Sequence, residues 1–138
     1  MLHLLLKYIT LNHNMYIYND KYLKSIYEER NGIIASEFYG DVLYLGLGSA
    51  FMYRQHTSKV KSTTFIENNE EIIKTYGKGL NIIQGDAHNI EITNEFDFII
   101  VDIWDKGVSK QEVETLVNKW YKNLKVKGSI LYLKTIKL

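Results

Sequence analysis

The sequence predicts an α/β fold of the Rossmann-like type, with a mostly parallel sheet and flanking helices. Residues 42–45 form a short apolar, β-favouring run, and small residues follow it closely at Gly46, Gly48 and Ala50. Further apolar runs downstream alternate with segments of helical spacing, as in βαβ units. A chain of 138 residues, 46% hydrophobic and 24% charged, is long enough to bury a core.

The first 38 residues are predicted to form a small antiparallel hairpin or meander ahead of the main sheet. Residues 15–18 favour a strand, Asn19 and Asp20 favour a turn, and residues 22–27 favour a second strand. Residues 21–29 suit a charged helical turn equally well. Residues 39–138 are expected to form the Rossmann-like domain.

Five strands are expected in that domain, at residues 42–45, 63–66, 80–83, 96–101 and 130–133. The fourth is apolar at five of its six positions, as expected of a central strand that is covered on both faces. Strands that alternate with helices predict a parallel sheet with right-handed crossovers, and the expected order of the strands is 3-2-1-4-5.

Helices are expected at residues 50–56, 69–76 and 109–124. The glycines of residues 77–79 should end the second helix in a left-handed turn. In the third, Ser109 and Glu112 resemble a capping box, and an apolar stripe follows at helical spacing before residues 127–128 end the helix.

Composition excludes several classes of protein. A net charge of +1 gives no electrostatic reason to expect nucleic acid or an anionic membrane as a partner. The absence of cysteine excludes disulfides and thiol catalysis, and the four scattered histidines show no metal-ligand spacing, so we expect no metal. The apolar residues 2–6 are too few to span a bilayer and lack the features of a leader. We expect a cytoplasmic protein that acts on a small molecule.

Glu67 is the strongest candidate for ligand binding. It follows the second strand about 20 residues after Gly46, the spacing at which an acidic residue in this fold accepts hydrogen bonds from ribose hydroxyls. A solvated Glu at a strand end is the alternative, but the glycine turn upstream favours the ribose interpretation.

The glycine turn also restricts which nucleotide the site could bind. A dinucleotide fingerprint needs a third glycine where this chain has Phe51, so NAD is disfavoured. The sequence has no phosphate-binding loop of the Gly-x-x-x-x-Gly-Lys-[Ser/Thr] type. A ligand with a ribose and an adenine but no phosphates fits better.

Two further strand ends carry carboxylates. Asp86 follows the third strand, where it could accept from an adenine amino group or form a turn with its own backbone. Asp102, Trp104 and Asp105 follow the fourth strand and together suit a cationic substrate, which carboxylates hold and deprotonate and an aromatic face attracts. The alternative is that Asp105 caps the next helix and that Trp104, like Tyr44, packs in the core.

These motifs resemble the class I S-adenosylmethionine-dependent methyltransferase superfamily, and within it the spermidine synthase (aminopropyltransferase) branch. Residues 42–50 look like its first motif, residues 85–87 like its adenine-side motif, and residues 96–105 like the strand that delivers the catalytic Asp. Arg54 matches an arginine often found after the glycine turn, and residues 120–131 are similar to the next helix and strand. The resemblance covers roughly residues 41–134.

The resemblance implies an enzyme that binds S-adenosylmethionine, or its decarboxylated form, without a metal and alkylates a small amine or other nucleophile. Gly46, Gly48 and Ser49 would admit the tail of the ligand, Glu67 would hold its ribose, and Asp86 with Ala87 would face its adenine. Asp102 and Asp105 would be catalytic, and Trp104 would bind the substrate.

The chain departs from that branch where the chemistry lies. Ser49 stands where the branch has an Asp that helps to hold an amine, and Lys106 stands where it has a Pro. No counterpart of its Tyr-His-Glu stretch precedes the first motif, and the antiparallel strand pair that usually completes the sheet is missing. An unpaired sheet edge and an uncovered apolar face would favour a homo-oligomer.

Two other functions therefore remain open. The chain could be a degenerate family member that binds the nucleotide, or nothing, and serves as an interaction subunit, because fold similarity alone does not prove activity. It could also keep the cofactor and cleave S-adenosylmethionine without an acceptor.

Overall fold

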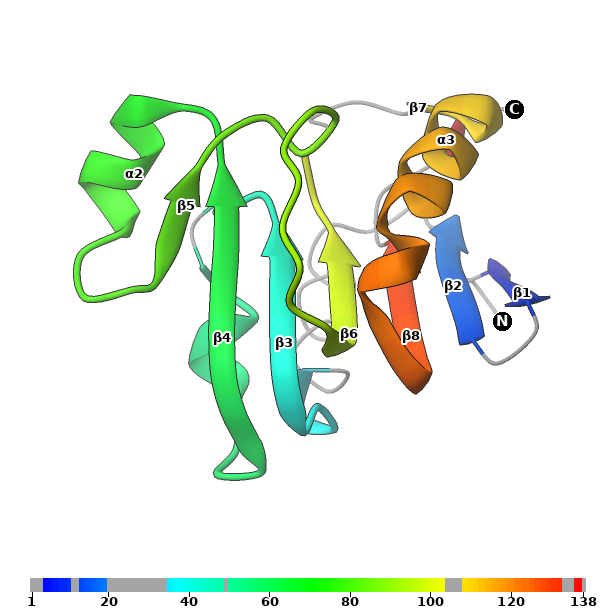
Figure 1. Ribbon diagram of the computed structural model, residues 1–138, viewed down its shortest axis with the longest axis horizontal. Coiled ribbons are helices and arrows are strands. Elements are labelled where there is room, and N and C mark those ends of the chain that lie inside the picture. Colours follow the sequence, from blue (N-terminus) through cyan, green and yellow to red (C-terminus); the bar gives the residue numbers. More distant parts are fainter. Residues whose placement is uncertain are drawn as a thin grey trace.

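The protein is built around one seven-stranded sheet (Figure 1). A computed structural model describes residues 4–10, 13–19, 35–48, 50–103, 108–132 and 136–137. The strands lie in the order β1-β2-β8-β6-β3-β4-β5, and a small second sheet pairs β7 with β9. The strand bounds are β1 Leu4–Thr10, β2 His13–Asn19, β3 Gly40–Leu45, β4 Val60–Glu67, β5 Ile82–Gln84, β6 Phe96–Val101, β7 Val108–Ser109, β8 Leu124–Tyr132 and β9 Ile136–Lys137.

The predicted order of the five parallel strands is confirmed. These strands are β3, β4, β5, β6 and β8, every neighbouring pair is parallel, and their order across the sheet is the expected 3-2-1-4-5. Their bounds differ from the expectation, because β4 begins at Val60, β5 at Ile82 and β8 at Leu124.

The N-terminal hairpin extends the same sheet. β1 pairs with β2 in antiparallel fashion, and β2 then pairs with β8 in parallel, with Asn14 opposite Ser129. β2 contains the strand predicted at residues 15–18, whereas the partner predicted at residues 22–27 lies outside the described residues. Because β2 pairs with β8, the sheet edge that motivated the expected homo-oligomer is covered; the oligomer and the domain boundary at residue 38 stay predictions.

The helix predicted at residues 50–56 is wrong. Only one turn of 3-10 helix, η1 (Tyr53–Gln55), forms there, and His56 leaves it in an extended conformation. The backbone of Ala50 has a positive φ of 59°, which an α-helix does not allow. At the other end, the His56 ring contacts Tyr44 and Thr63, which holds this residue in its extended conformation.

Helix α2 (Glu70–Tyr76) begins as predicted. The Asn69 side chain accepts hydrogen bonds from the backbone amides of Glu71 and Ile72 and so caps its first turn. The left-handed turn expected at its end is at Gly79, with φ of +79°, whereas Gly77 keeps a right-handed conformation.

Helix α3 (Lys110–Trp120) also has the predicted cap, because the Ser109 hydroxyl accepts from the backbone amide of Glu112 at 3.2 Å. It ends earlier than expected. A turn of 3-10 helix, η2 (Tyr121–Asn123), follows it, Leu124 starts β8, and Lys127 takes a positive φ within that strand. None of the helices in the described part of the chain combines the length and hydrophobicity needed to cross a membrane.

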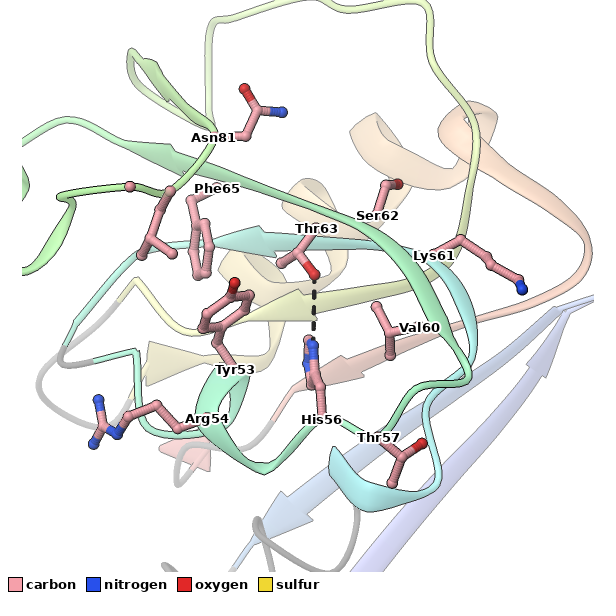
Figure 2. A pocket seen from close by; sticks show the side chains of 12 residues that line it. Tyr53, Arg54, His56, Thr57, Val60, Lys61, Ser62, Thr63, Phe65 and Asn81 are labelled. Carbon is pink, nitrogen blue, oxygen red and sulfur yellow. Dashed lines mark hydrogen bonds between the residues drawn. The ribbon is translucent and has the colours of Figure 1, made fainter.

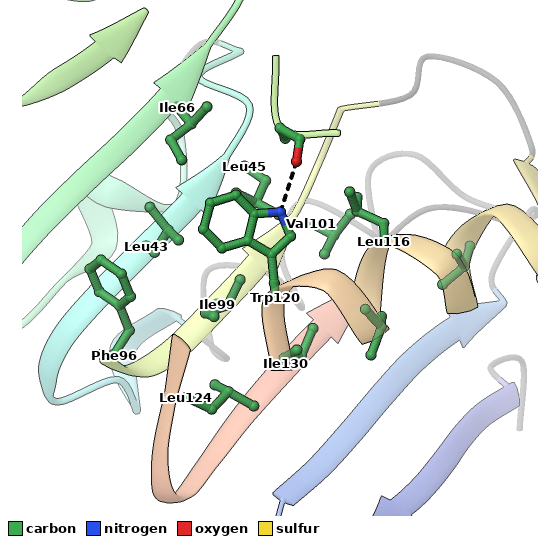
Figure 3. Close-up of a cluster of buried hydrophobic side chains, with 13 residues drawn as sticks. Leu43, Leu45, Ile66, Phe96, Ile99, Val101, Leu116, Trp120, Leu124 and Ile130 are labelled. Atoms are coloured by element: carbon green, nitrogen blue, oxygen red, sulfur yellow. Dashed lines mark hydrogen bonds between the residues drawn. The ribbon is translucent and has the colours of Figure 1, made fainter. Parts of the chain in front are cut away.

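Alternate residues of the strands fill two cores on opposite faces of the sheet. In the α3-side core, shown in Figure 3, the Trp120 side chain is 1% exposed among apolar residues of β3, β6 and β8. In the aromatic-side core, the ring of Phe38 stacks on that of Phe98, and Tyr44 stacks on Phe65. The buried strand residues divide between the two cores: Leu43, Leu45, Ile66, Ile99 and Ile130 in the first, and Val42, Tyr44, Phe65, Ile100 and Leu131 in the second.

Charged side chains join four strands at the amino ends of the sheet. Lys125 Nζ lies 2.7 Å from Asp41 Oδ2 and 3.0 Å from Asp97 Oδ2. Asp97 Oδ2 also accepts from the backbone amide of Asp41 at 2.8 Å, and Ser62 Oγ donates to Asp41 Oδ1.

Candidate functional site

A crevice of about 420 Å³ opens at the carboxyl ends of the parallel strands. We call it the carboxyl-edge crevice. It is lined by residues that directly follow four different strands, which is where ligands bind in open α/β sheets. The predicted site residues in its lining are Gly46 and Gly48 after β3, Glu67 at the end of β4, Asp86 and Ala87 after β5, and Asp102 after β6. The predicted site residues Ser49, Trp104 and Asp105 lie outside the described part of the chain.

Gly46 allows β3 and β6 to meet at the floor of the crevice. Its φ of +105° disfavours any residue with a side chain, and a Cβ there would collide with the carbonyl oxygen of Asp102 and lie 2.9 Å from its carbonyl carbon. Its amide donates to Ile66 O at 2.8 Å. The first glycine of the motif is therefore required by the packing of the strand ends.

Gly48 differs from Gly46. It also has a positive φ, of +52°, but a Cβ at this position would meet no atom within 4 Å. The missing side chain is therefore not needed for the packing of the protein's own backbone, and Gly48 lines the crevice.

Glu67 is oriented by the backbone around the crevice. Its Oε1 accepts from the amide of Leu47 at 2.8 Å, and its Oε2 accepts from the amides of Asn68 and Asn69 at 3.1 and 2.9 Å. Since a carboxylate has about four lone-pair sites, three hydrogen bonds leave it room to accept one more. The glycine turn and the end of β4 are thus joined through one carboxylate.

Asp86 forms the turn that the sequence left open as an alternative to ligand binding. Its Oδ1 accepts from the His88 amide at 2.9 Å and lies 3.0 Å from His88 Nδ1, and its Oδ2 accepts from Asn89 Nδ2. The backbone hydrogen bond from His88, with the imidazole second, lowers the pKa of Asp86, which keeps it ionised at neutral pH. The carboxylate also lines the crevice, so the turn and a ligand contact are compatible.

Trp120 supports the loop that carries Asp86. Its Nε1 donates to the carbonyl oxygen of Ala87 at 2.9 Å, a contact drawn in Figure 3, and Ala87 is 5% exposed. The sequence predicted Trp120 only as part of an apolar stripe. A buried indole N–H needs an acceptor, so the sequence indicates that Trp120 donates a hydrogen bond. It does not indicate which residue accepts it.

Asp102 follows the central strand β6 and faces the crevice beside the glycine turn. Its amide donates to Leu45 O at 2.9 Å, which fixes its backbone against β3. Tyr44 lies nearby in β3 and is 4% exposed. Burial, reinforced by the charge of Asp102, raises the pKa of the Tyr44 hydroxyl far above its usual value, so this hydroxyl stays protonated.

Three polar residues of the crevice were not predicted from the sequence: Asn68, Asn69 and His88. Asn68 and Asn69 follow Glu67 directly, and His88 follows the glycine of residue 85 by three positions, so proximity to the predicted motifs was the available signal. Within the described residues, no three His, Asp or Glu side chains are placed to hold a metal ion.

The arrangement suits a neutral or cationic ligand with hydroxyls and an amine. Three carboxylates line a cavity whose backbone turn is open at Gly48. Carboxylates accept hydrogen bonds from hydroxyls and amino groups, stabilise a positive charge and can take up a proton.

No protein-family model matches this chain, and no curated protein matches it. Solved structures do match. The model aligns with DesVI of Streptomyces venezuelae at 16% identity and a TM-score of 0.61, covering 78% of this chain and 51% of DesVI. It aligns with an S-adenosylmethionine-dependent methyltransferase from Clostridium acetobutylicum ATCC 824 at 18% identity and a TM-score of 0.52, covering 78% and 48%.

A third match is the complex of DhpI with SAH (S-adenosylhomocysteine), at 17% identity and a TM-score of 0.56, covering 78% of this chain and 65% of DhpI. The chain thus spans about half to two thirds of the length of these three proteins. At such identities the similarity shows that the chain has the fold found in S-adenosylmethionine-dependent methyltransferases.

Proposed function

We propose that this chain binds S-adenosylmethionine, or its decarboxylated form, in the carboxyl-edge crevice and transfers a group from it to a small amine or similar nucleophile. The observation that carries the proposal is the meeting of Glu67, Asp86 and Asp102 around an open glycine turn at one edge of a methyltransferase-like sheet.

Glu67 is proposed to hold the ribose. Backbone amides already orient its two oxygens, and the acceptor capacity that remains suits a ribose hydroxyl. Because its orientation does not depend on the ligand, binding would cost little side-chain entropy.

Asp86 and Gly48 are proposed to contact the two ends of the ligand. Asp86 stays ionised and would accept a hydrogen bond from the adenine amino group. The open space at Gly48 would admit the other end, together with Ser49, for which the family resemblance supplies the argument.

Asp102 is proposed to orient the nucleophile and accept its proton. When bound, the sulfonium supplies an electrophilic carbon. The protein then contributes mainly positioning and the removal of one proton. By the family resemblance, Asp105 would assist as a second carboxylate, and the ring of Trp104 would attract a cationic acceptor.

The spermidine synthase type of reaction is the narrower form of the proposal. Residues 96–105 support it by resemblance, whereas Ser49, in place of an Asp that would hold an amine, favours a function without aminopropyl transfer, including a subunit that only binds the nucleotide. Tighter binding of decarboxylated S-adenosylmethionine would support aminopropyl transfer, and tighter binding of S-adenosylmethionine would favour a function without it.

Calorimetric titration with S-adenosylmethionine, decarboxylated S-adenosylmethionine, methylthioadenosine and NAD tests the proposal. We expect micromolar binding of one sulfonium ligand and none of NAD, with the preferred form identifying the transferred group. Glu67→Ala should weaken that binding at least about tenfold, the loss typical of a charge-assisted hydrogen bond.

Asp102→Asn tests the chemistry separately from binding. It should sharply reduce turnover with an amine acceptor while leaving the affinity for the nucleotide nearly unchanged. Unchanged turnover in the variant would exclude Asp102 from the proposed role. If neither the wild-type protein nor the variant formed product with any amine, the binding-only subunit would be favoured.

A further inference from the structure

A second cavity, of about 580 Å³, lies beside η1 and the amino-terminal half of β4. We call it the β4 pocket; Figure 2 shows its lining. It shares no lining residue with the carboxyl-edge crevice. Thr63 lines the pocket and Glu67 lines the crevice, four residues further along the same strand, which is about 13 Å. The volume is within the range of small-molecule sites.

The lining of the β4 pocket is polar and basic. Arg54 and Lys61 supply two positive charges, and Thr57 and Asn81 supply a hydroxyl and an amide group, whereas the Ser62 hydroxyl donates to Asp41 Oδ1. None of the described residues that line the pocket is an Asp or a Glu. In Figure 2, Arg54 and Lys61 lie on opposite sides of the group formed by Tyr53, His56 and Thr63. A cavity with this charge favours an anion.

Aromatic rings form the inner side of the same pocket. Tyr53 and Phe65 meet edge to face with their centroids 5.6 Å apart, and Phe65 is 1% exposed, so its position is fixed by the core. Phe65 thus supports the partly exposed ring of Tyr53, which offers an apolar surface to a further ring.

His56 joins the polar and aromatic parts of the pocket. Its Nε2 lies 2.6 Å from the Tyr44 hydroxyl, and its Nδ1 lies 3.5 Å from Thr63 Oγ1, the contact drawn in Figure 2. The ring is also packed by Phe38 and Tyr53. Burial lowers the pKa of His56 to about 4, so the imidazole is neutral at pH 7 and can hydrogen-bond a ligand through its Nδ1 edge.

We propose that the β4 pocket binds a small aromatic anion, of the aryl carboxylate or aryl phosphate class. The ring would pack on Tyr53, and the anionic group would reach a basic side chain and the Thr57 hydroxyl, which accepts from the Lys59 amide and still has a proton to donate. The position of the pocket at the amino ends of the strands separates it from the proposed reaction, so the ligand is a second molecule and not the acceptor.

The proposal is tested by NMR titration of the ¹⁵N-labelled protein with phenyl phosphate and benzoate. Benzyl alcohol serves as the neutral ring and inorganic phosphate as the anion without a ring. We expect the aryl anions to shift the amide resonances of Thr63 and Asn81 in a saturable way and to leave those of Gly48 and Glu67 unchanged. The two controls should bind at least about tenfold more weakly, since each lacks one of the two recognised features.

Variants locate the anionic group. Arg54→Ala and Lys61→Ala each remove one exposed cation, and at least one of them should weaken aryl-anion binding about threefold to tenfold. Lys74→Ala is the matched control, because Lys74 is an exposed lysine of α2 outside the pocket and pairs only loosely with Glu71 at 3.8 Å. Glu67→Ala should leave aryl-anion binding unchanged, which separates this test from that of the proposed function.

His56 gives a second readout. An anion bound beside the imidazole favours its protonated form, so the pKa of His56, followed by its ring resonances, should rise from about 4 on saturation. Equal binding of benzyl alcohol and phenyl phosphate, shifts confined to the carboxyl-edge crevice, or unchanged affinity in both the Arg54 and Lys61 variants would each overturn the proposal.

Discussion

The strand pair β3 and β6 has a glycine facing an aspartate at each end, and the two ends do different things. At the amino end, Gly40 faces Asp97, whose carboxylate is bound to the Asp41 amide and to Lys125. At the carboxyl end, Gly46 faces the backbone of Asp102, and Asp102 lines the crevice. At one end the glycine makes room for a carboxylate that joins the strands, and at the other it makes room for the backbone of a residue that lines the crevice.

This difference shows how one local rule serves two purposes. A glycine at a strand end lets the neighbouring strand approach closely in either case. Whether the site is structural or functional depends on the partners around it, because Lys125 offers the amino end a cation whereas the carboxyl end has three acidic groups around a cavity.

The largest effect should come from Gly46→Ala. The new Cβ would collide with the Asp102 carbonyl in a backbone conformation that alanine disfavours, so we expect the free energy of unfolding to fall by about 3 kcal/mol or more. Urea denaturation followed by circular dichroism measures the loss. Gly40→Ala should cost a similar amount, because its Cβ would lie 2.7 Å from Asp97 Cγ at φ of +69°.

Gly48→Ala is the matched control at the carboxyl end. Its Cβ would enter open space in the left-handed region, so the cost in stability should be only about 1 kcal/mol. Affinity for the nucleotide should nevertheless fall, because Gly48 lines the crevice and is proposed to admit one end of the ligand. A loss of stability as large as that of Gly46→Ala would contradict the distinction between the two glycines.

A smaller effect is expected for Trp120→Phe. The change leaves the Ala87 carbonyl without its indole donor in a buried position, which should lower the free energy of unfolding by about 2 kcal/mol. Since that carbonyl belongs to the loop of Asp86, the amides of residues 85–88 should also exchange hydrogen faster. Hydrogen exchange that rises equally over the whole α3-side core would show instead that Trp120 acts only by packing.

The smallest effect should come from Lys125→Met, at the amino end. Hydrogen bonding from Lys125, with a smaller contribution from Ser62, lowers the pKa of Asp41. A carboxyl whose folded-state pKa lies below its unfolded value stabilises the fold above about pH 4 and loses this contribution as the pH falls further. The variant should therefore be less stable at pH 7 and lose less stability between pH 4 and pH 2, as measured by urea midpoints.

Lys122→Met is the control for that variant, because Lys122 pairs with Glu91 at 2.6 Å in a largely exposed position. It should change stability little. Neither lysine variant should alter affinity for the nucleotide, and a large loss of affinity in Lys125→Met would show that the two ends of the strand pair are coupled.

The strand order and the corners of the crevice could be predicted from the sequence because they rest on local patterns. Apolar runs identify buried strands, and parallel strands bring their carboxyl ends to one edge, so Gly46, Glu67, Asp86 and Asp102 had to converge once the order was right. The partners of these side chains depend on distant atoms. The bond from Trp120 to Ala87 joins residues 33 positions apart, and no local pattern specifies it.

The helix expected at residues 50–56 failed for a different reason. The local pattern permits a helix, but Ala50 has a positive φ of 59°, and His56 is held by Tyr44 and Thr63 in an extended exit from η1. Tertiary contacts overrode local propensity there, and the β4 pocket lies beside the shortened turn.

The carboxyl-edge crevice lies between two parts of the sheet, each of which is connected by contacts that are close in sequence. On one side of it, β4 and β5 join residues 17 positions apart, as in the bond from Asn81 to Thr64. On the other side, η2 contacts the chain before β6 over 31 positions, from Asn123 to Ile92. Between the two sides, the amide of Asp41 reaches Asp97 over 56 positions. Two locally connected halves, β3-β4-β5 and β6-α3-β8, therefore have to dock before Gly46 meets Asp102. Docking of distant segments is the slow part of folding. A ligand that bridges Glu67 and Asp102 would hold the halves together, so occupancy of the crevice should slow unfolding as well as stabilise the native state.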